Sequence, residues 1–384
     1  MRRTFKASDG HRMNMGEHKD AILTVDLAAI AANWRTLRNA VAPAACAAVV
    51  KADAYGLGMG MVAPALAEAG CRTFYVAQID EGISLRAILP DADIAVFGGV
   101  FSGAEAAFIE HRLIPVLNSL DQIERWGVAA AHAKMRLRAI LHVDTGLNRL
   151  GLPRDEVDRL VGAPDRLAAF DILAVISHLA CSDERQNPMN RRQLDDFNRL
   201  RAKLPPARAG IAASSGIYLT AAYHLDEVRP GAALYGVAPQ PDIATPVAQV
   251  VQLHAKILQV RNVDSTMTVG YGAAYRARRP SRIATVGVGY ADGYFRSLGD
   301  SGEGYIGEYA APVVGRISMD LITVDVTDVP ADCAHSGASV ELLGPHRPVD
   351  LFAAQAGTIG YEVLTSLGAG KRVGRRYVGG TRWE

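Results

Sequence analysis

The sequence predicts an α/β protein with an N-terminal TIM (β/α)8 barrel over residues 21–248 and a mainly β C-terminal domain over residues 249–384. Up to about residue 249, short apolar runs rich in β-branched residues alternate with longer stretches of helical spacing, and about eight such units make this barrel. After Pro246, strand-like runs are separated by Gly, Pro and Asp with little helical pattern. An open doubly wound sheet is the alternative for the first part, since periodicity alone does not count barrel strands.

The strands expected in the barrel are short apolar runs bounded by turn residues. In chain order they are residues 47–50, 74–77, 94–98, 115–117, 139–144, 173–178, 209–214 and 228–235. The helices expected between them keep apolar residues three and four positions apart, which gives each helix one face to bury on the strands. They cover residues 27–41, 62–69, 80–89, 120–132, 156–161 and 191–204.

The second domain is expected to consist mainly of strands, with one helical pattern near its end. The strands are residues 250–263, 282–290, 311–316, 321–326 and 339–343, and the helical pattern covers residues 351–356.

Size and composition exclude several classes of protein. The 384 residues are 49% hydrophobic, enough for large cores, and the net charge of +1 gives no overall reason to expect nucleic acid or a membrane surface as a partner. No apolar run approaches membrane-spanning length, and the four cysteines are scattered without a CxxC pair, so we expect reduced thiols and a cytoplasmic location. Residues 1–20 are expected to form a disordered extension. Alternatively, the start of the sequence is misplaced, and Met13 or Met15 is the true first residue.

One stretch, residues 49–58, places a lysine at the tip of the first expected strand. The apolar run ends at Val50, and Lys51 is followed by small residues, Tyr55 and two glycines. The carboxyl ends of barrel strands form the reactive face, so an amine there can be desolvated, lose its proton near neutral pH and form a Schiff base with an aldehyde cofactor. The structural alternative is a lysine that snorkels at a strand-to-loop boundary.

Further residues that can carry chemistry follow successive expected strands. Arg149 lies shortly after the fifth strand, and His178 ends the sixth. Ser215 opens a helix after the seventh strand, where free N–H groups and the helix dipole favour a phosphate, and Arg229 lies on the eighth. Each of the last three residues also has a purely structural explanation: His178 as a core histidine, Ser215 as a helix cap and Arg229 as half of an ion pair. Their shared position at strand ends favours one active site.

Residues 49–58 closely resemble the pyridoxal phosphate (PLP) lysine motif of alanine racemases, with Leu57 where the family has a histidine. Further segments resemble motifs of the same family, in the family's order. They are residues 143–151, 177–184, 228–236, 269–275, 289–294, 314–320 and 357–362. The resemblance covers essentially the whole chain from Ala21 onward.

The resemblance implies a head-to-tail homodimer in which each active site is completed by the partner's β domain. Lys51 would hold PLP, Arg229 would face its pyridine nitrogen, and His178 would face its ring. The groups that bind the phosphate would be Tyr55, Ser215, Gly231, Ala232 and Tyr361. The groups around the substrate would be Arg149 and the backbone N–H of Met319 on its carboxylate, with Tyr290 and Tyr275 near the entrance. No metal site is expected.

Racemisation takes the α-proton from one face of the substrate and returns one to the other face, so it needs an acid/base group on each side. By resemblance Lys51 serves one face, and Tyr271 of the partner subunit serves the other. A phenol ordinarily titrates near pH 10, and neighbouring positive charge would lower its pKa. PLP conjugates the α-carbon with its ring and so stabilises the carbanion.

Arg229 bears on the type of reaction. A guanidinium keeps its proton, so the pyridine nitrogen beside it stays largely unprotonated and the electron sink is weaker, which limits side reactions such as transamination. Decarboxylases that share the barrel use an acidic residue at this nitrogen. Arg229 therefore argues against a decarboxylase.

Three positions depart from the family pattern. His142 stands where the family often has a lysine that becomes carbamylated and braces the substrate arginine, so we expect Arg149 to be held by a neutral imidazole, a bound anion or Asp144, without dependence on carbon dioxide. Ser214 stands where asparagine is usual, and Ser318 where cysteine is common. We expect these two to affect affinity or the accepted side chain, and not the reaction type.

The sequence therefore predicts a PLP-dependent enzyme that interconverts L- and D-alanine by two bases. It leaves open whether the enzyme supplies D-alanine for a bacterial cell wall or degrades it. One alternative is a racemase of broader range that acts on serine or other small amino acids. A remote alternative is a non-catalytic PLP carrier, but such carriers lack the β domain and the second base.

Overall fold

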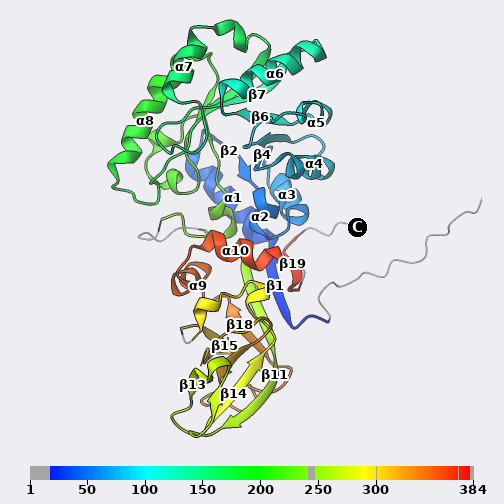
Figure 1. The fold of residues 1–384 in the computed structure, drawn as a ribbon, viewed down its shortest axis with the longest axis vertical. Helices are drawn as coiled ribbons and strands as arrows, with labels where there is room; N and C mark the ends of the chain where they lie inside the picture. Colours follow the sequence, from blue (N-terminus) through cyan, green and yellow to red (C-terminus); the bar gives the residue numbers. More distant parts are fainter. Residues whose placement is uncertain (1–17, 241–246, 300, 371, 381–384) are drawn as a thin grey trace, which may run out of the picture. The chain divides into compact units, whose positions relative to one another are not determined.

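The computed structural model describes residues 18–240, 247–299, 301–370 and 372–380 (Figure 1). Most of the extension predicted over residues 1–20 falls in residues 1–17, outside the described part. The chain forms two compact units, each assembled from separate segments. The barrel unit consists of Val25–Val251, Leu343–Ala369 and residues 377–380; the β unit consists of residues 18–24, Gln252–Leu342 and Gly370–Arg376. The sequence predicted one division of the chain, between residues 248 and 249. In the structure, residues 18–24 belong to the β unit and Leu343–Ala369 belongs to the barrel unit.

The barrel unit contains a closed parallel barrel. One sheet runs in the order β3 (Ala48–Val49), β4 (Thr73–Val76), β5 (Asp93–Val96), β6 (Ile114–Leu117), β7 (Leu137–His142), β8 (Phe170–Ile176) and β9 (Arg208–Gly210). A further pair joins β10 (Glu227–Val228) to β2 (Ala45–Cys46) in parallel. Backbone hydrogen bonds close the ring, from Asp226 N–H to the Ala209 carbonyl at 3.0 Å and from Val49 N–H to the Pro230 carbonyl at 2.9 Å. The predicted barrel is confirmed, and the open sheet is wrong.

Helices cover the outside of these strands (Figure 1). They are α1 (Leu27–Val41), α3 (Met59–Glu68), α4 (Ile79–Ile88), α5 (Glu105–Glu110), α6 (Leu120–Ala133), α7 (Arg154–Val161) and α8 (Pro188–Arg201). The predicted helices are confirmed to within a few residues, and α1 shows why. The Asp26 side chain caps its first turn by accepting the Ala29 N–H at 2.9 Å, and the buried stripe repeats every three or four residues through Ile30, Trp34 and Leu37.

The strand predicted over residues 228–235 is wrong beyond its first residue. β10 ends at Val228, and Ala232–Tyr235 forms a 3-10 helix. Pro230 has no N–H for a sheet, so the strand stops there, while the apolar run that follows is equally compatible with a buried helical turn. The strand predicted over residues 209–214 is too long for the same reason. β9 ends at Gly210, and Ser215–Tyr218 forms a short 3-10 helix.

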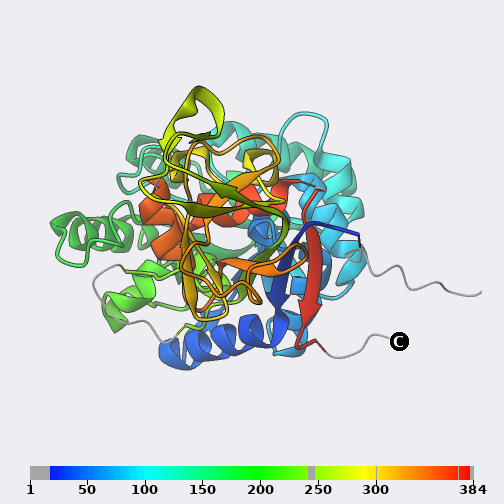
Figure 2. The ribbon, with the colours of Figure 1, turned by 90° about the horizontal axis from the view of Figure 1, so that it is seen from below.

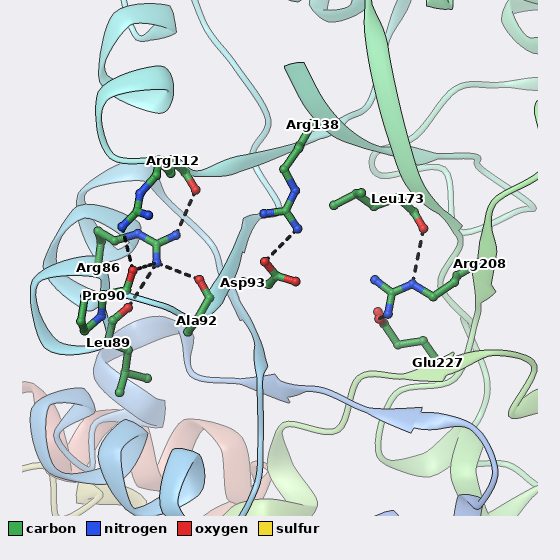
Figure 3. Close-up of polar contacts among 10 residues, drawn as sticks. All are labelled: Arg86, Leu89, Pro90, Ala92, Asp93, Arg112, Arg138, Leu173, Arg208 and Glu227. Atoms are coloured by element: carbon green, nitrogen blue, oxygen red, sulfur yellow. Dashed lines mark hydrogen bonds and ion pairs between the residues drawn. The ribbon is translucent and has the colours of Figure 1, made fainter. Parts of the chain in front are cut away.

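Polar contacts at the amino ends of the strands brace the barrel (Figure 3). Arg138 pairs with Asp93 at 2.8 Å, and Arg208 lies 3.5 Å from the buried carboxylate of Glu227. Arg86 donates to a ring of backbone carbonyls, those of Leu89, Pro90, Ala92, His111 and Arg112. This end of a TIM barrel usually serves stability, which leaves the opposite end for chemistry.

The β unit is built around an antiparallel sheet. Its strands run in the order β16 (Tyr309–Pro312), β15 (Glu303–Ile306), β18 (Ser339–Leu343), β11 (Val251–Val263), β1 (Ala21–Asp26) and β19 (Gly374–Val378), and Figure 2 shows β1 in blue beside β19 in red. Off this path, β14 (Ser281–Val286) pairs with β11 and β17 (Ile322–Asp325). A small hairpin joins β12 (Thr268–Val269) to β13 (Tyr275–Arg276).

The mainly β character predicted for this region is confirmed, and the predicted strand 339–343 matches β18. The strand predicted over residues 282–290 is too long, because β14 ends at Val286 and Tyr290 opens a 3-10 helix. The helices α9 (Val349–Ala356) and α10 (Gly360–Ala369) belong to the barrel unit. No helix in the described ranges is both long and apolar enough to cross a membrane.

Candidate active site

Lys51 follows β3 at the carboxyl end of the barrel and opens the short helix α2 (Lys51–Tyr55). The four residues after it, Ala52 to Tyr55, have φ between 54° and 57°, so this turn is left-handed. L-residues pay roughly 1–2 kcal/mol each for that conformation. Backbone strain of this kind persists only where the surroundings hold it, and it concentrates at functional sites.

Local hydrogen bonds hold the left-handed turn. The Ala54 N–H donates to the Val50 carbonyl at 2.9 Å, and the Gly56 N–H donates to the Ala52 carbonyl at 2.7 Å. The carboxylate of Asp53 accepts the N–H of Met59 at 2.7 Å and so ties the turn to the start of α3. The chain then leaves the turn through Gly56, whose φ of 82° suits glycine.

The surroundings of Lys51 favour its neutral, nucleophilic amine. Burial lowers the pKa of Lys51, and the positive charge of Arg149 lowers it further, while Glu81 opposes the shift. The amine lies 5.9 Å from the centre of the Phe97 ring, which in turn stacks on Tyr75 at 5.0 Å. This apolar, partly buried setting fits a lysine that forms a covalent bond with a carbonyl.

Three hydroxyl groups gather near the left-handed turn. The ring of Tyr55 lies 6.0 Å from the ring of Tyr361 on α10, and the Ser215 hydroxyl lies close enough to the Tyr361 phenol to act on its pKa. A Cβ on Gly231 would overlap the Tyr55 hydroxyl, so only glycine allows this approach. Burial raises the pKa of both phenols, which keeps them protonated as hydrogen-bond donors. Ala232 follows Gly231 as the first residue of a 3-10 helix.

Ser214 connects the loops after β9 and β10. Its hydroxyl accepts the backbone N–H groups of Gly231 and Ala233, each at 3.1 Å, and the side chain is buried. A serine is long enough for this double contact. The serine at this position therefore ties the loop after β9 to Gly231 and Ala233.

Arg229 reaches across the barrel to the end of β8. Its Nη2 donates to the Ser177 carbonyl at 2.6 Å, and its guanidinium lies 5.9 Å from the centre of the Tyr75 ring. The other terminal nitrogen, Nη1, is buried and has no hydrogen-bond acceptor among the described residues. An unpaired buried donor is costly, so this N–H group is suited to an acceptor atom of a ligand.

Gln193 on α8 positions the loop that carries His178. Its side chain is fully buried; its Nε2 donates to the His178 carbonyl at 2.9 Å and to the Thr145 hydroxyl at 3.2 Å, and its Oε1 accepts the Ala180 N–H at 2.8 Å. The Gln193 amide therefore bonds to the backbone groups of His178 and Ala180, as a neighbouring strand would do in a sheet. Burial and the positive charge of Arg229 lower the pKa of His178 to about 3, so its imidazole is neutral.

His142 ends β7 beside Asn118, with 2.8 Å between Nδ1 of His142 and Oδ1 of Asn118. Burial, followed by the charge of Arg229, lowers the pKa of His142 to about 4, so this imidazole is also neutral at physiological pH. Asp144, two residues further on, accepts the N–H groups of Gly146, Leu147 and Asn148 and so fixes the loop that carries Arg149. Arg149 itself is exposed in the isolated chain.

The other predicted site residues lie in the β unit. Tyr271 opens a 3-10 helix between β12 and β13 and is 72% exposed. Tyr290 and Met319 are also exposed, and their segments are joined because the Tyr290 N–H donates to the Ser318 carbonyl at 3.1 Å. Tyr275 is half-buried in β13, with its hydroxyl 3.5 Å from Asp325.

Arg372 braces the segments that carry Tyr290 and Met319. Its Nε donates to Asp292 at 2.8 Å, and its Nη2 donates to Asp320. The Ser318 hydroxyl donates to the Leu321 carbonyl at 2.8 Å and shapes the same turn.

Sequence patterns did not single out Glu81, Asn118, Gln193 or the role of Ser214. Gln193 alone carries a signal, because it lies on the apolar stripe of α8 with Leu194, Phe197 and Leu200. A polar side chain on a buried helical stripe indicates a specific hydrogen-bond partner. The others bond to backbone groups of distant loops, and no sequence spacing predicts those contacts.

The fold is that of a TIM-barrel enzyme with an additional β unit, and it places Lys51, an amine of lowered pKa, at the carboxyl end of a barrel strand. Residues 25–239 match the family model of the alanine racemase N-terminal domain, and residues 250–377 match that of the C-terminal domain. The chain belongs to the alanine racemase family.

Relatives match it over nearly their whole length. The alanine racemase of Rhodospirillum rubrum is 52% identical over 370 residues, which cover 95% of this chain and 98% of that protein. The alanine racemase of Brucella abortus is 46% identical, with 93% of each chain covered. Among solved structures, alanine racemase from Bartonella henselae, with covalently bound pyridoxal phosphate, is 44% identical with a TM-score of 0.90, covering 94% of this chain and 99% of that chain.

Proposed function

We propose that the protein is a PLP-dependent alanine racemase. The observation that carries this proposal is Lys51, an amine with a lowered pKa at the carboxyl end of a barrel strand, in a chain of this family. Full-length relatives named alanine racemase support the reaction, and the Bartonella henselae structure with covalently bound pyridoxal phosphate supports the cofactor.

The residues of the barrel unit fit PLP. The buried and unpaired Nη1 of Arg229 offers a donor to the pyridine nitrogen, which would then accept without being protonated. The hydroxyls of Tyr55, Ser215 and Tyr361 offer donors to a phosphate, together with the backbone N–H of Ala232 and the close approach at Gly231. The neutral imidazole of His178 can lie against the ring without adding charge.

When bound, PLP would stabilise the negative charge that forms on the α-carbon when its proton leaves. The chain's own groups would move and hold the proton. Lys51 would take the α-proton from one face or return it, because its lowered pKa brings the neutral amine into the working range. Arg149 and the backbone N–H of Met319 would hold the substrate carboxylate. Tyr290 and Tyr275 would border the entrance.

We also propose a homodimer in which Tyr271 of the partner subunit serves the opposite face of the substrate. The exposure of Tyr271, Tyr290 and Met319 in the isolated chain supports this assignment, because large apolar and aromatic side chains on one unit suit an interface. A base held on a separate subunit also ensures that each face of the substrate meets its own proton carrier.

Mixed dimers test the shared site. We expect Lys51→Ala and Tyr271→Phe homodimers to be inactive. Random mixing of the two should restore about one quarter of wild-type activity, since half of the dimers are mixed and each holds one intact site. Tyr309→Phe, an exposed tyrosine of β16, serves as the matched control and should stay active. Absence of recovery in verified mixed dimers would refute the shared site.

A further inference from the structure

The left-handed turn after Lys51 is held from outside by one carboxylate. Oε1 of Glu81 accepts the N–H of Ala52, the residue next to Lys51, at 2.5 Å. Oε2 of the same carboxylate accepts the N–H of Ala77 at 2.8 Å and that of Gln78 at 3.2 Å. Glu81 thus connects the loop after β3 to the loop after β4.

Only part of this arrangement is explained by helix capping. Glu81 is the third residue of α4, and in a capping box this residue bonds to the N–H of the cap residue, here Gln78. The bond to Ala77 extends that contact by one residue. The bond to Ala52 adds nothing to α4, because Ala52 lies in another loop.

The contact with Ala52 is placed where it constrains Lys51 most. Ala52 has a φ of 55°, and its N–H is the first backbone donor after the lysine. A charged acceptor makes this hydrogen bond short and strong, so it can oppose relaxation of Ala52 toward ordinary helical geometry. Such a relaxation would rotate the peptide that follows Lys51 and redirect the lysine side chain.

We propose that Glu81 is a positioning residue for Lys51: its carboxylate holds the left-handed turn and so aims the amine into the site. This inference rests on the proposed PLP-dependent function, because the aim of the amine matters only where it must meet the cofactor aldehyde. The charge of Glu81 also lies close enough to act on the lysine amine, which agrees with the contact geometry.

Glu81→Gln tests the proposal. A glutamine offers one acceptor oxygen in place of two, so either Ala52 or the pair Ala77 and Gln78 would face an amide donor. The variant and the wild type are titrated with PLP, which links covalently to a lysine with loss of water, and with pyridoxamine phosphate, which has no aldehyde. Glu105→Gln is the matched control, since Glu105 also accepts a loop N–H, that of Gly103 at 2.8 Å, away from Lys51.

We expect Glu81→Gln to weaken PLP binding about tenfold and to leave pyridoxamine phosphate binding within twofold of the wild type. Borohydride trapping followed by mass spectrometry should show less of the cofactor attached to Lys51. Glu105→Gln should change neither affinity. In a Lys51→Ala background the further change Glu81→Gln should have no effect on PLP binding, because there is no amine left to aim.

Equal weakening of both ligands, or the same loss of PLP binding in the Lys51→Ala background, would overturn the proposal and leave Glu81 a structural cap. If Glu81→Gln does not fold, Glu81→Asp, which is one methylene too short to reach both loops, is measured by the same criteria. Failure of the wild type to attach PLP to Lys51 would instead refute the proposed function, so the two failures are distinguishable.

Discussion

Oδ1 of Asn118 lies 2.8 Å from Nδ1 of His142, and the Asn118 amide is fixed in orientation. Its Nδ2 donates to the Val116 carbonyl at 2.8 Å and to the Phe97 carbonyl at 3.0 Å, so its oxygen must face the histidine. His142 therefore carries its proton on Nδ1 and leaves Nε2 as an acceptor. A half-buried imidazole in one tautomer supplies a neutral acceptor at a position where the family often has a carbamylated lysine.

The first prediction follows from this neutral acceptor. Racemisation should proceed at the same rate in buffer stripped of carbon dioxide and in buffer with added bicarbonate, because His142 forms no stable carbamate. The measurement is kcat/KM for L-alanine under both conditions. A rate that falls on removal of carbon dioxide and returns with bicarbonate would show that a carbamate elsewhere braces the site.

The second prediction concerns stability against pH. The pKa of His142 is lowered to about 4 and that of His178 to about 3, while an unfolded histidine titrates near 6.5. The unfolded chain therefore binds more protons below pH 6.5, so the stabilisation is complete above that pH and is lost as the pH falls toward 4 and then 3.

Replacing one of these histidines should make the free energy of unfolding less dependent on pH. His142→Gln should reduce the slope between pH 6 and pH 4 by up to about 1.4 kcal/mol per pH unit. Gln259→Asn, at an exposed position of the β unit, changes no titratable group; it is the control, and its slope should equal that of the wild type. Denaturant titrations across this pH range measure the effect; an unaltered slope in His142→Gln would contradict a neutral imidazole at this position.

The third prediction concerns Gln193. Gln193→Leu removes three hydrogen bonds and leaves the His178 carbonyl and the Ala180 N–H without their partner, so it should cost about 2–4 kcal/mol of unfolding free energy. It should also weaken PLP binding, because residues 178–180 lose their support. Gln259→Leu, on the surface of the β unit, should change stability by less than about 0.5 kcal/mol. Equal effects of both variants would refute the positioning role.

The fourth prediction concerns the contact between α10 and the left-handed turn. A Cβ on Gly368 would overlap the carbonyl oxygen of Gly56, so Gly368→Ala should displace α10, lower the free energy of unfolding by about 1–3 kcal/mol and weaken PLP binding through Tyr361. Gly60→Ala on α3 meets no atom within 4 Å and should be neutral or slightly stabilising. Wild-type stability and PLP affinity in Gly368→Ala would contradict the close packing seen here.

The sequence predicted the barrel, the β region and the helices because periodic burial is a local property. The apolar stripe of α1 and its Asp26 cap appear directly in the order of residues. The strand predicted to continue to Tyr235 was wrong, because a buried apolar run does not distinguish a strand from a 3-10 helix.

The positions of the predicted site residues depend on contacts that no local pattern reveals. Sequence placed Lys51 at a strand end but gave no sign of the left-handed turn, since Ala52, Asp53 and Ala54 have no preference for positive φ as strong as that of glycine. Glu81, Asn118 and Gln193 bond to backbone groups many residues away. The return of Leu343–Ala369 to the barrel unit likewise depends on tertiary packing.

The most direct test of the account is racemisation itself. Purified protein with PLP is incubated in deuterated water with L-alanine and, separately, with L-serine, while formation of the D-enantiomer and exchange of the α-proton are followed together. We predict rapid formation of D-alanine with deuterium at the α-carbon, slower turnover of serine, and loss of both in Lys51→Ala. Binding of PLP without exchange or D-alanine formation, or undiminished racemisation by Lys51→Ala, would contradict the central claim that Lys51 carries the proton in an alanine racemase.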